Sequence, residues 1–552
     1  MEPIRQKHWD PLQMGLWLGR LALWLLVGAL VLYPLGMVFV STVFAGSFGE
    51  PPFQMGDLLT PRIVSAWRNT LLLGFWVTLL STAWAAPLAL LALGSPWARW
   101  LDGLMSIPFL TPPFLVSLAW TLAVGRRGYL SGWGLPGSAA EGILFSVGGL
   151  ALLMSLNYTP MVYFALRAQS SGVAGSLLWA GQVAGGCRRS VLWRILLPLV
   201  LPGFWAGGFL AFASCISEYG TPLVIGNRIG FPVVATEIAR LINVSPINLT
   251  LASAMGSLLL ITGASFYCLS RLLQQPSPLT SSRSHYPPPI LLAAWARVGC
   301  WGLAALYALL AVILPYSSIG TTSLLRLLSR GPAWDNLTLE HYATLLQVGS
   351  RGFSALTTSL GLALLAATLG TLVGLLAVRV SPWMATVATI PVAIPAITTA
   401  VGFIRAWNAP WAHGIPLYGT ALLVGLYYTA QYLPYAVQYA QAGNAGLPIS
   451  YARAARLHGA GASTTFFRIL LPLLWPHSLA GALLIFSIAF RELVGSSLLR
   501  PPGLQTTSTF ILGQFDQGSA SAGMAMGVMA VLLAWISVVS VRRVGLKQTL
   551  VE

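Results

Sequence analysis

Two glutamates, Glu218 and Glu492, are the acidic residues whose placement most indicates chemistry, because each ends a strongly apolar stretch. A carboxylate at membrane depth is costly to bury and usually faces a cavity or a partner. The two positions are 274 residues apart. As a pair, with the adjacent Tyr219, they would offer a path for a cation or its hydrated complex. Alternatively, each carboxylate pairs locally, for example Glu492 with Arg491, or caps a helix. By the same logic Arg405 and Arg491 could line an anion route.

The remaining reactive residues form no catalytic or metal-ligand pattern. The six histidines are dispersed, and the four cysteines lie in or beside apolar segments without CxxC spacing, as expected of small apolar residues. We therefore expect no bound metal and no enzymatic site. A phosphate-cradling loop needs a lysine after a Gly-rich turn, but Lys7 and Lys547 are the only lysines and neither lies in one. We expect the chain to bind no ATP or other cofactor itself.

The offset of 274 residues relates two copies of one unit. Residues 179–202 read WAGQVAGGCRRSVLWRILLPLVLP, and residues 453–476 read RAARLHGAGASTTFFRILLPLLWP. The six residues from Arg194 recur from Arg468, and outside these stretches Tyr158 aligns with Tyr432. A colinear match of this kind indicates an internal repeat.

Composition places both copies in a membrane. Hydrophobic residues make up 56% of the chain and charged residues only 8%, with a mean hydropathy of +0.76, whereas a soluble domain carries roughly 25% charged residues. Apolar runs near the roughly 20 residues that cross a bilayer recur along the chain, so we expect an all-α polytopic membrane protein. The net charge of +17 comes from Arg and Lys scattered between apolar runs, as the positive-inside bias produces. No face or tail is densely basic, so nucleic-acid binding is not expected.

We expect about twelve membrane-spanning helices, six in each half. The predicted spans are 14–43, 69–93, 103–124, 142–166, 198–217, 249–272, 291–315, 355–379, 385–407, 417–441, 472–491 and 518–541. The Pro- and Ser-rich stretch 273–289 is predicted to be a cytoplasmic linker between a first repeat, 1–272, and a second, 290–552. Arg and Lys placement predicts that both termini and both repeated loops lie in the cytoplasm.

Each repeated loop, near 176–197 and 450–471, is predicted to form a short helix, a turn, a second short helix and then a membrane span. Gly185 and Gly459 would allow a left-handed turn or a close backbone approach. Pro198 and Pro472 would set the entry into the next span, since Pro is tolerated in a first helical turn. Small residues would give the first short helix a flat face able to lie in a groove on a partner. These are Ala180, Ala454 and Ala455. The alternative is a plain re-entry loop.

The loops resemble the EAA loop of bacterial ABC-importer permeases, whose pattern is Glu-Ala-Ala, three residues, Gly, nine residues, Ile, one residue, Leu-Pro. The matching residues are Gly185, Ile195 and Pro198 in one copy and Gly459, Ile469 and Pro472 in the other. At the Glu-Ala-Ala positions stand Trp179, Ala180 and Gly181, and Arg453, Ala454 and Ala455. In that family the loop forms a coupling helix that docks into a cleft of the ATPase subunit. Because both copies lack the Glu, the contact that it makes in relatives is in doubt here.

The resemblance covers nearly all the chain and implies the type I permease fold of two six-helix halves. Pro-broken third helices are indicated at Ile107-Pro108 and Pro112-Pro113, and at Ile390-Pro391 and Ile394-Pro395. Among fused permeases, the ferric-iron and thiamine group is the most similar. The stretch from Glu218 to Pro222, and Glu492 followed by Ser497 to Gly503, resemble ferric-type signatures. Polyamine and phosphonate permeases share parts of them.

The resemblance implies the permease of an ATP-driven importer in the bacterial inner membrane. Its partners would be membrane lipid, two copies of an ABC ATPase that bind the ATP, and a periplasmic or lipid-anchored binding protein that delivers the cargo. One chain would form the whole pore. The best guess for the cargo is ferric iron, with thiamine, polyamine or phosphonate as alternatives. An ion-gradient-driven secondary transporter is the second class, although such proteins tend to need an acid deep in the bundle.

Overall fold

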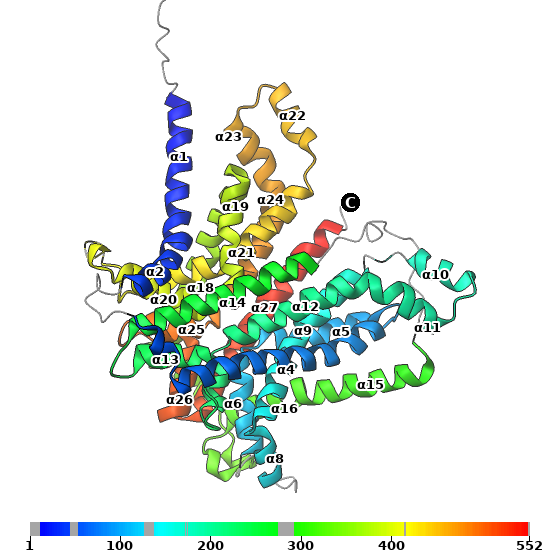
Figure 1. Ribbon diagram of the computed structural model, residues 1–552, viewed down its shortest axis with the longest axis vertical. Coiled ribbons are helices and arrows are strands. Elements are labelled where there is room, and N and C mark those ends of the chain that lie inside the picture. The colour runs from blue at the N-terminus through cyan, green and yellow to red at the C-terminus, as the bar shows by residue number, and fades with distance from the viewer. Residues whose placement is uncertain are drawn as a thin grey trace, which may run out of the picture.

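A computed structural model describes residues 11–44, 53–125, 137–171, 173, 175–273, 292–412, 414 and 416–549. These residues form a bundle of long helices (Figure 1). Nine described helices are long and apolar enough to cross a membrane, or up to eleven if each of two bent pairs is one span. Helix α21, Ala421–Ala445, is equally long but less apolar, and it is largely buried among the others. The predicted all-α fold with about twelve membrane helices is confirmed.

In the first half, the spans are α1 Pro11–Val27 continued by α2 Tyr33–Val43, then α4 Pro61–Ala92, the pair α5 Ala98–Leu110 and α6 Pro113–Val124, α9 Val147–Ser171, α12 Leu197–Ser217 and α14 Leu249–Leu273. In the second half, they are α15 Ala294–Ala308 continued by α16 Leu314–Leu324, then α18 Arg351–Val380, the pair α19 Pro382–Thr389 and α20 Ala396–Trp407, α21, α24 Leu471–Phe490 and α27 Ala520–Thr549. Residues 274–289 of the predicted linker lie outside the described residues.

The third span of each half is broken at proline, as predicted. Helices α5 and α6 meet at 91°, and the α19 segment meets α20 at 112°. Pro112 and Pro395 each stand directly before the second helix of their pair, with ψ of 129° and 133°. Proline cannot donate the backbone hydrogen bond that would continue the first helix, so the chain turns at both places.

The first span of each half packs against the other half. Helices α1 and α2 contact α18, α19 and α20 of the second half, whereas α15 and α16 contact α4 and α6 of the first half. The Tyr33 hydroxyl donates to the Ala406 carbonyl at 2.8 Å, and the Tyr307 hydroxyl donates to the Leu156 carbonyl at 2.9 Å. These crossed contacts interlock the two halves.

Two ends of the bundle can be told apart in Figure 1. The start of α1, the C-terminal end of α27 and both repeated loops lie toward one end, whereas α8 Gly137–Leu144, α13 Val234–Asn243 and α26 Thr507–Gln517 lie toward the other. We call the second end the outer end.

Candidate functional sites: a central cavity and two repeated loops

A cavity of about 290 Å³ lies where the two halves meet. Its walls come from the break between α5 and α6, from α9 and α21, and from the outer ends of α12 and α24. Both Glu218 and Glu492 line this cavity, together with Tyr219. The structure therefore brings together the three residues that the sequence indicated for a substrate path. Arg405 does not line it; in α20 its Nε donates to Ser253 Oγ of α14 at 3.0 Å.

Both carboxylates accept hydrogen bonds from the backbone that follows them. Glu218 Oε1 accepts from the Gly220 and Thr221 N–H groups, each at 3.1 Å. Glu492 accepts from the Gly495 N–H at 2.9 Å and the Ser496 N–H at 3.1 Å. These N–H groups lie at the starts of η4 Pro222–Gly226 and α25 Val494–Leu499, where the backbone N–H groups of a helix have no acceptor within the helix. The two carboxylates supply those acceptors. Each glutamate thus caps locally and also lines the cavity.

Three further tyrosines besides Tyr219 line the cavity, and sequence reasoning gave them no role in the substrate path. The Tyr158 hydroxyl donates to Glu218 Oε2 at 2.8 Å. Its repeat counterpart Tyr432 lines the same cavity, as does Tyr435. The signal was available, because Tyr158 and Tyr432 are among the few polar residues that the two copies share at the repeat offset. Among the described residues, no three His, Cys, Asp or Glu side chains lie together as metal ligands would.

The repeated loops have the predicted helix–turn–helix form. The first contains α10 Gly175–Val183 and α11 Arg188–Val191, and the second contains α22 Ile449–Leu457 and α23 Ala462–Thr465. A single π-helical turn then leads into α12 or α24, at 192–196 and 466–470. Pro198 and Pro472 lie in the first turn of those spans, as predicted.

The two loops turn in the same way. Gly185 and Gly459 have φ of 88° and 80°, so the predicted left-handed turn is confirmed. The Gly186 N–H donates to the Gly181 carbonyl, and the Ala460 N–H donates to the Ala455 carbonyl, both at 3.0 Å. In each loop this bond joins the sixth residue of the turn to the first, and the glycine at positive φ lies between them. A helix that ends in this way has a Schellman motif.

Some of the small residues before the turn are packed inside the loop, and others are exposed on its surface. A Cβ at Gly181 would lie 2.6 Å from Ile195 Cδ1 of the same loop, and its counterpart Ala455 is buried. These positions pack the two short helices together, so Ala455 does not belong to an outward face, contrary to the prediction. Ala180 and Ala454 are exposed, as are the residues in place of the family's Glu, Trp179 and Arg453.

Exposed apolar side chains mark the tips of both loops. Val183 and Leu457, at equivalent positions, are 87% and 86% exposed. Beyond the tips, the equivalent residues Trp193 and Phe467 lie in the π-helical turns that lead into α12 and α24, and they are 59% and 62% exposed. Apolar side chains gathered at a tip typically mark a protein contact. Sequence reasoning did not single out these four residues.

The comparison with known proteins agrees with this geometry. Residues 359–545 match the family described as binding-protein-dependent transport system inner membrane component. The chain is similar to the 2-aminoethylphosphonate transport system permease protein PhnU of Salmonella choleraesuis, at 30% identity over 219 residues, which are 37% of this chain and 76% of PhnU. The chain belongs to this permease family.

Two further relatives of the permease span most of its length. It is 24% identical over 538 residues to the ferric transport system permease protein FbpB of Actinobacillus pleuropneumoniae, covering 93% of this chain and 76% of that protein. It is 27% identical over 481 residues to FbpB 1 of Haemophilus influenzae, covering 84% and 74%. Members of this family are membrane permeases of ABC importers and are not enzymes themselves.

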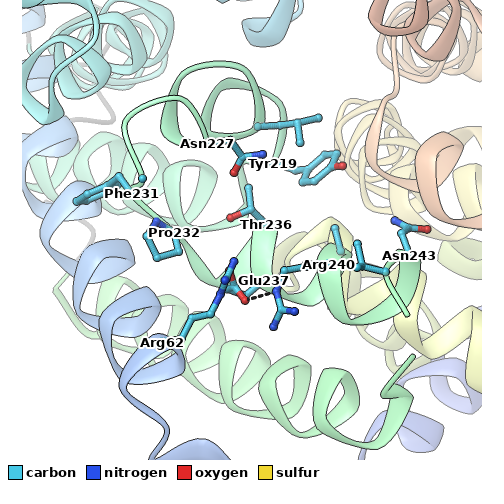
Figure 2. A pocket seen from close by; sticks show the side chains of 13 residues that line it. Arg62, Tyr219, Asn227, Phe231, Pro232, Thr236, Glu237, Arg240 and Asn243 are labelled. Atoms are coloured by element: carbon cyan, nitrogen blue, oxygen red, sulfur yellow. Dashed lines mark hydrogen bonds and ion pairs between the residues drawn. The ribbon is translucent and has the colours of Figure 1, made fainter. Parts of the chain in front are cut away.

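At its outer end the permease has a second pocket, of about 560 Å³ (Figure 2). Glu237 of α13 holds two arginines there. Its Oε1 accepts from Arg62 Nη2 and its Oε2 accepts from Arg240 Nε, each at 2.8 Å. Burial raises the pKa of Glu237, but the hydrogen bonds from both arginines outweigh it, so that pKa lies below its usual value. Tyr219 lines this outer pocket as well as the central cavity and therefore stands between them.

Two residues in the third turn of α4 anchor the segment that carries this pocket. Asn69 Nδ2 donates to the Pro232 carbonyl at 3.0 Å, and Thr70 Oγ1 accepts from the Val234 N–H at 2.9 Å. In the second half, Ser359 Oγ accepts from the Thr507 N–H at 2.7 Å in the same manner. The permease thus ties each outer helix to the second span of its own half.

Proposed function

We propose that this chain is the complete transmembrane permease of an ATP-driven importer, with ferric iron as the best-supported cargo. The repeated loops carry this proposal, because each half presents the same helix–turn–helix with an exposed apolar tip toward one end of the bundle. Two such loops would engage two copies of one ATPase. The chain would lie in the bacterial inner membrane with both termini and both loops in the cytoplasm, where the arginine-rich segments belong.

In this proposal the partners supply ATP hydrolysis and cargo delivery. ATP binding would draw the two ATPases together and move the loops, and the π-helical turns would pass this movement into α12 and α24. Both of those helices end at the central cavity with Glu218 and Glu492. The cavity would then open alternately to the outside, where a binding protein releases the cargo, and to the cytoplasm. Membership of the permease family favours this mechanism over an ion-gradient-driven one.

The missing Glu of the coupling loop would be replaced by different contacts in the two copies. Trp179 offers an aromatic ring and Arg453 a guanidinium at the same position. An arginine there needs an acidic acceptor on the ATPase. The tips, Val183 and Leu457, would supply the shared apolar contact, so the two docking sites would be alike in shape and different in charge.

The oxygen donors of the central cavity support a ferric cargo. Glu218 and Glu492 offer carboxylates, and Tyr158 and Tyr432 offer phenol oxygens. Hard, highly charged cations prefer oxygen ligands of this kind. The relatives that span most of the chain are named as ferric transport permeases. An aminophosphonate is the second candidate, since relatives that match part of the chain are named for 2-aminoethylphosphonate transport.

Uptake of radiolabelled ferric citrate tests this proposal. The chain would be expressed with its ATPase and binding protein in cells that lack their own ferric importer. We expect ATP-dependent uptake that falls at least roughly tenfold in Glu218→Gln and Glu492→Gln, which keep the shape but remove the charge. Arg330→Gln, at an exposed arginine that does not line the cavity, serves as the control. Uptake that is independent of the ATPase would contradict the proposal.

A further inference from the structure

The acidic residues of the central cavity occur as an equivalent pair, one from each half, but its basic residue has no such counterpart. Glu218 and Glu492 are equivalent by the repeat, as are Tyr158 and Tyr432. The residue before each glutamate breaks this symmetry, because it is Ser217 in the first half and Arg491 in the second. Arg491 is the only cationic side chain among the described residues that line the cavity. A charged group at membrane depth is costly and usually functional.

The guanidinium of Arg491 is only partly used by the protein. Its Nη2 donates to the Phe109 carbonyl at 3.1 Å, in the last turn of α5. Its Nη1 is buried and has no hydrogen-bond partner within the described part of the chain. Glu218 is near enough to attract Arg491 electrostatically, but among the described residues no ion pair within 4.0 Å joins Arg491 to Glu218 or Glu492. An unmet charged donor beside a cavity calls for an acceptor that the protein does not supply.

The two carboxylates of the cavity, in contrast to Arg491, already have several hydrogen-bond partners. Glu218 accepts two backbone N–H groups and the Tyr158 hydroxyl, and Glu492 accepts two backbone N–H groups. Their charges still favour a cation nearby, but much of their hydrogen-bonding capacity is met. The strongest unmet donor of the cavity is therefore a guanidinium, whose planar pair of nitrogens suits a carboxylate, phosphate or phosphonate.

We propose that Arg491 binds an anionic oxygen group of the cargo. The cargo would then carry both a cationic centre, drawn to the carboxylates, and an oxyanion, drawn to Arg491. A ferric ion with a bound oxyanion and an aminophosphonate both have this character, whereas a bare cation does not. Because Ser217 stands at the equivalent position, the cavity offers one anion site and would hold such a cargo in one orientation. This inference rests on the proposed function and narrows its substrate class.

The test compares Arg491→Gln and Arg491→Lys with the unchanged chain in uptake by the complete importer. Three probes would be used separately: ferric citrate, 2-aminoethylphosphonate and spermidine, a cation without an anionic group. For whichever oxyanion-bearing probe is transported, we expect Arg491→Gln to raise KM at least about tenfold, with a smaller change in Vmax. Arg491→Lys should recover part of the loss because it keeps the charge. Arg326→Gln, the same substitution at an exposed arginine, should leave KM unchanged.

The outcomes separate this inference from the function that it rests on. Failure of every probe to enter in an ATP-dependent manner would count against the importer itself. Transport of spermidine with no transport of the other two would overturn the anion site while leaving the importer intact. An unchanged KM in Arg491→Gln, or equal losses of Vmax in Arg491→Gln and Arg491→Lys, would show that Arg491 only ties α24 to α5.

Discussion

At the repeated loops, the two halves share the same turn and the same closing hydrogen bond, whereas their outer helices α13 and α26 carry different chemistry. In each half, one backbone N–H group of the outer helix, that of Val234 or Thr507, is hydrogen-bonded to the second span. Three residues later the first half has Glu237 and the second half has Phe510. The ion pairs of Glu237 therefore have no counterpart in α26. Under the proposed function, the loops would meet two copies of one ATPase and would have to keep one shape. The outer helices would meet a single binding protein, so they would be free to differ between the halves.

The largest expected effect comes from breaking the shared turn. Gly185→Asp or Gly459→Asp would place a side chain at φ near 80–90°, a backbone conformation that other residues rarely adopt, and would add a charge at the proposed docking point. We expect either variant to reduce co-purification of the ATPase and uptake at least about tenfold. Gly349→Asp is the matched control, since Gly349 has φ of 88° with open space around it in the segment between α17 Glu340–Leu346 and α18. Equal losses in all three variants would contradict a docking role.

The exposed apolar residues at the loop tips, Val183 and Leu457, give a second test of whether both loops contact the ATPase. We expect Leu457→Asp to lower ATPase co-purification with little effect on the thermal stability of the permease, because Leu457 is almost fully exposed. Val183→Asp should have a similar effect, of about 1–3 kcal/mol in binding free energy. Val348→Asp, at a valine that is 81% exposed before α18, should bind the ATPase normally. Normal binding by both loop variants would remove the tips from the interface.

The segments after the two glutamates differ in how they pack. A Cβ at Gly495 would collide with the ring of the buried Tyr427. At the equivalent position the side chain of Thr221 fits, and its Oγ1 accepts a hydrogen bond from Ser117 Oγ at 3.1 Å. We expect Gly495→Ala to destabilise the fold by about 1–3 kcal/mol through overpacking, and Thr221→Ala by only about 1 kcal/mol. Unfolding in detergent measures both. Equal costs would show that the two segments tolerate the same side chains.

The smallest effect is expected from the outer ion pairs. Because the pKa of Glu237 is lowered in the folded state, its contribution is fully present above the unfolded pKa of roughly 4.3 and is lost as the pH falls through the folded value. We expect Glu237→Gln to lower stability at pH 7 by about 1 kcal/mol, a difference that disappears under strongly acidic conditions. Glu340→Gln, whose pair with Arg326 is exposed, serves as the control and should change stability at pH 7 by less than about 0.5 kcal/mol. A difference between Glu237→Gln and the unchanged chain that persists at low pH would contradict the assignment.

Much of this architecture could be predicted because the deciding signals are local. Hydropathy indicates the spans, proline indicates the breaks at Pro112 and Pro395, and the repeat offset pairs Glu218 with Glu492. The bounds were less accurate where a helix leaves the apolar stretch. Helix α4 begins at Pro61, eight residues before the predicted start, because Pro61 starts a helix well before the first apolar run.

Contacts between distant segments could not be predicted. The exchange of the first spans depends on which apolar surfaces fit each other, and no periodicity specifies that choice. The burial of Ala455 depends on the partner helix across the turn, and the bond from Arg62 to Glu237 joins residues 175 positions apart, which one sequence gives no reason to pair.

The mass of the intact complex tests the central claim most directly. The permease would be purified with its ATPase from mild detergent and weighed by native mass spectrometry. One permease chain with two ATPase copies is the predicted assembly, because one chain carries both docking loops. Two permease chains in the complex, or a single ATPase on one chain, would contradict the claim that the duplicated chain forms a whole permease by itself.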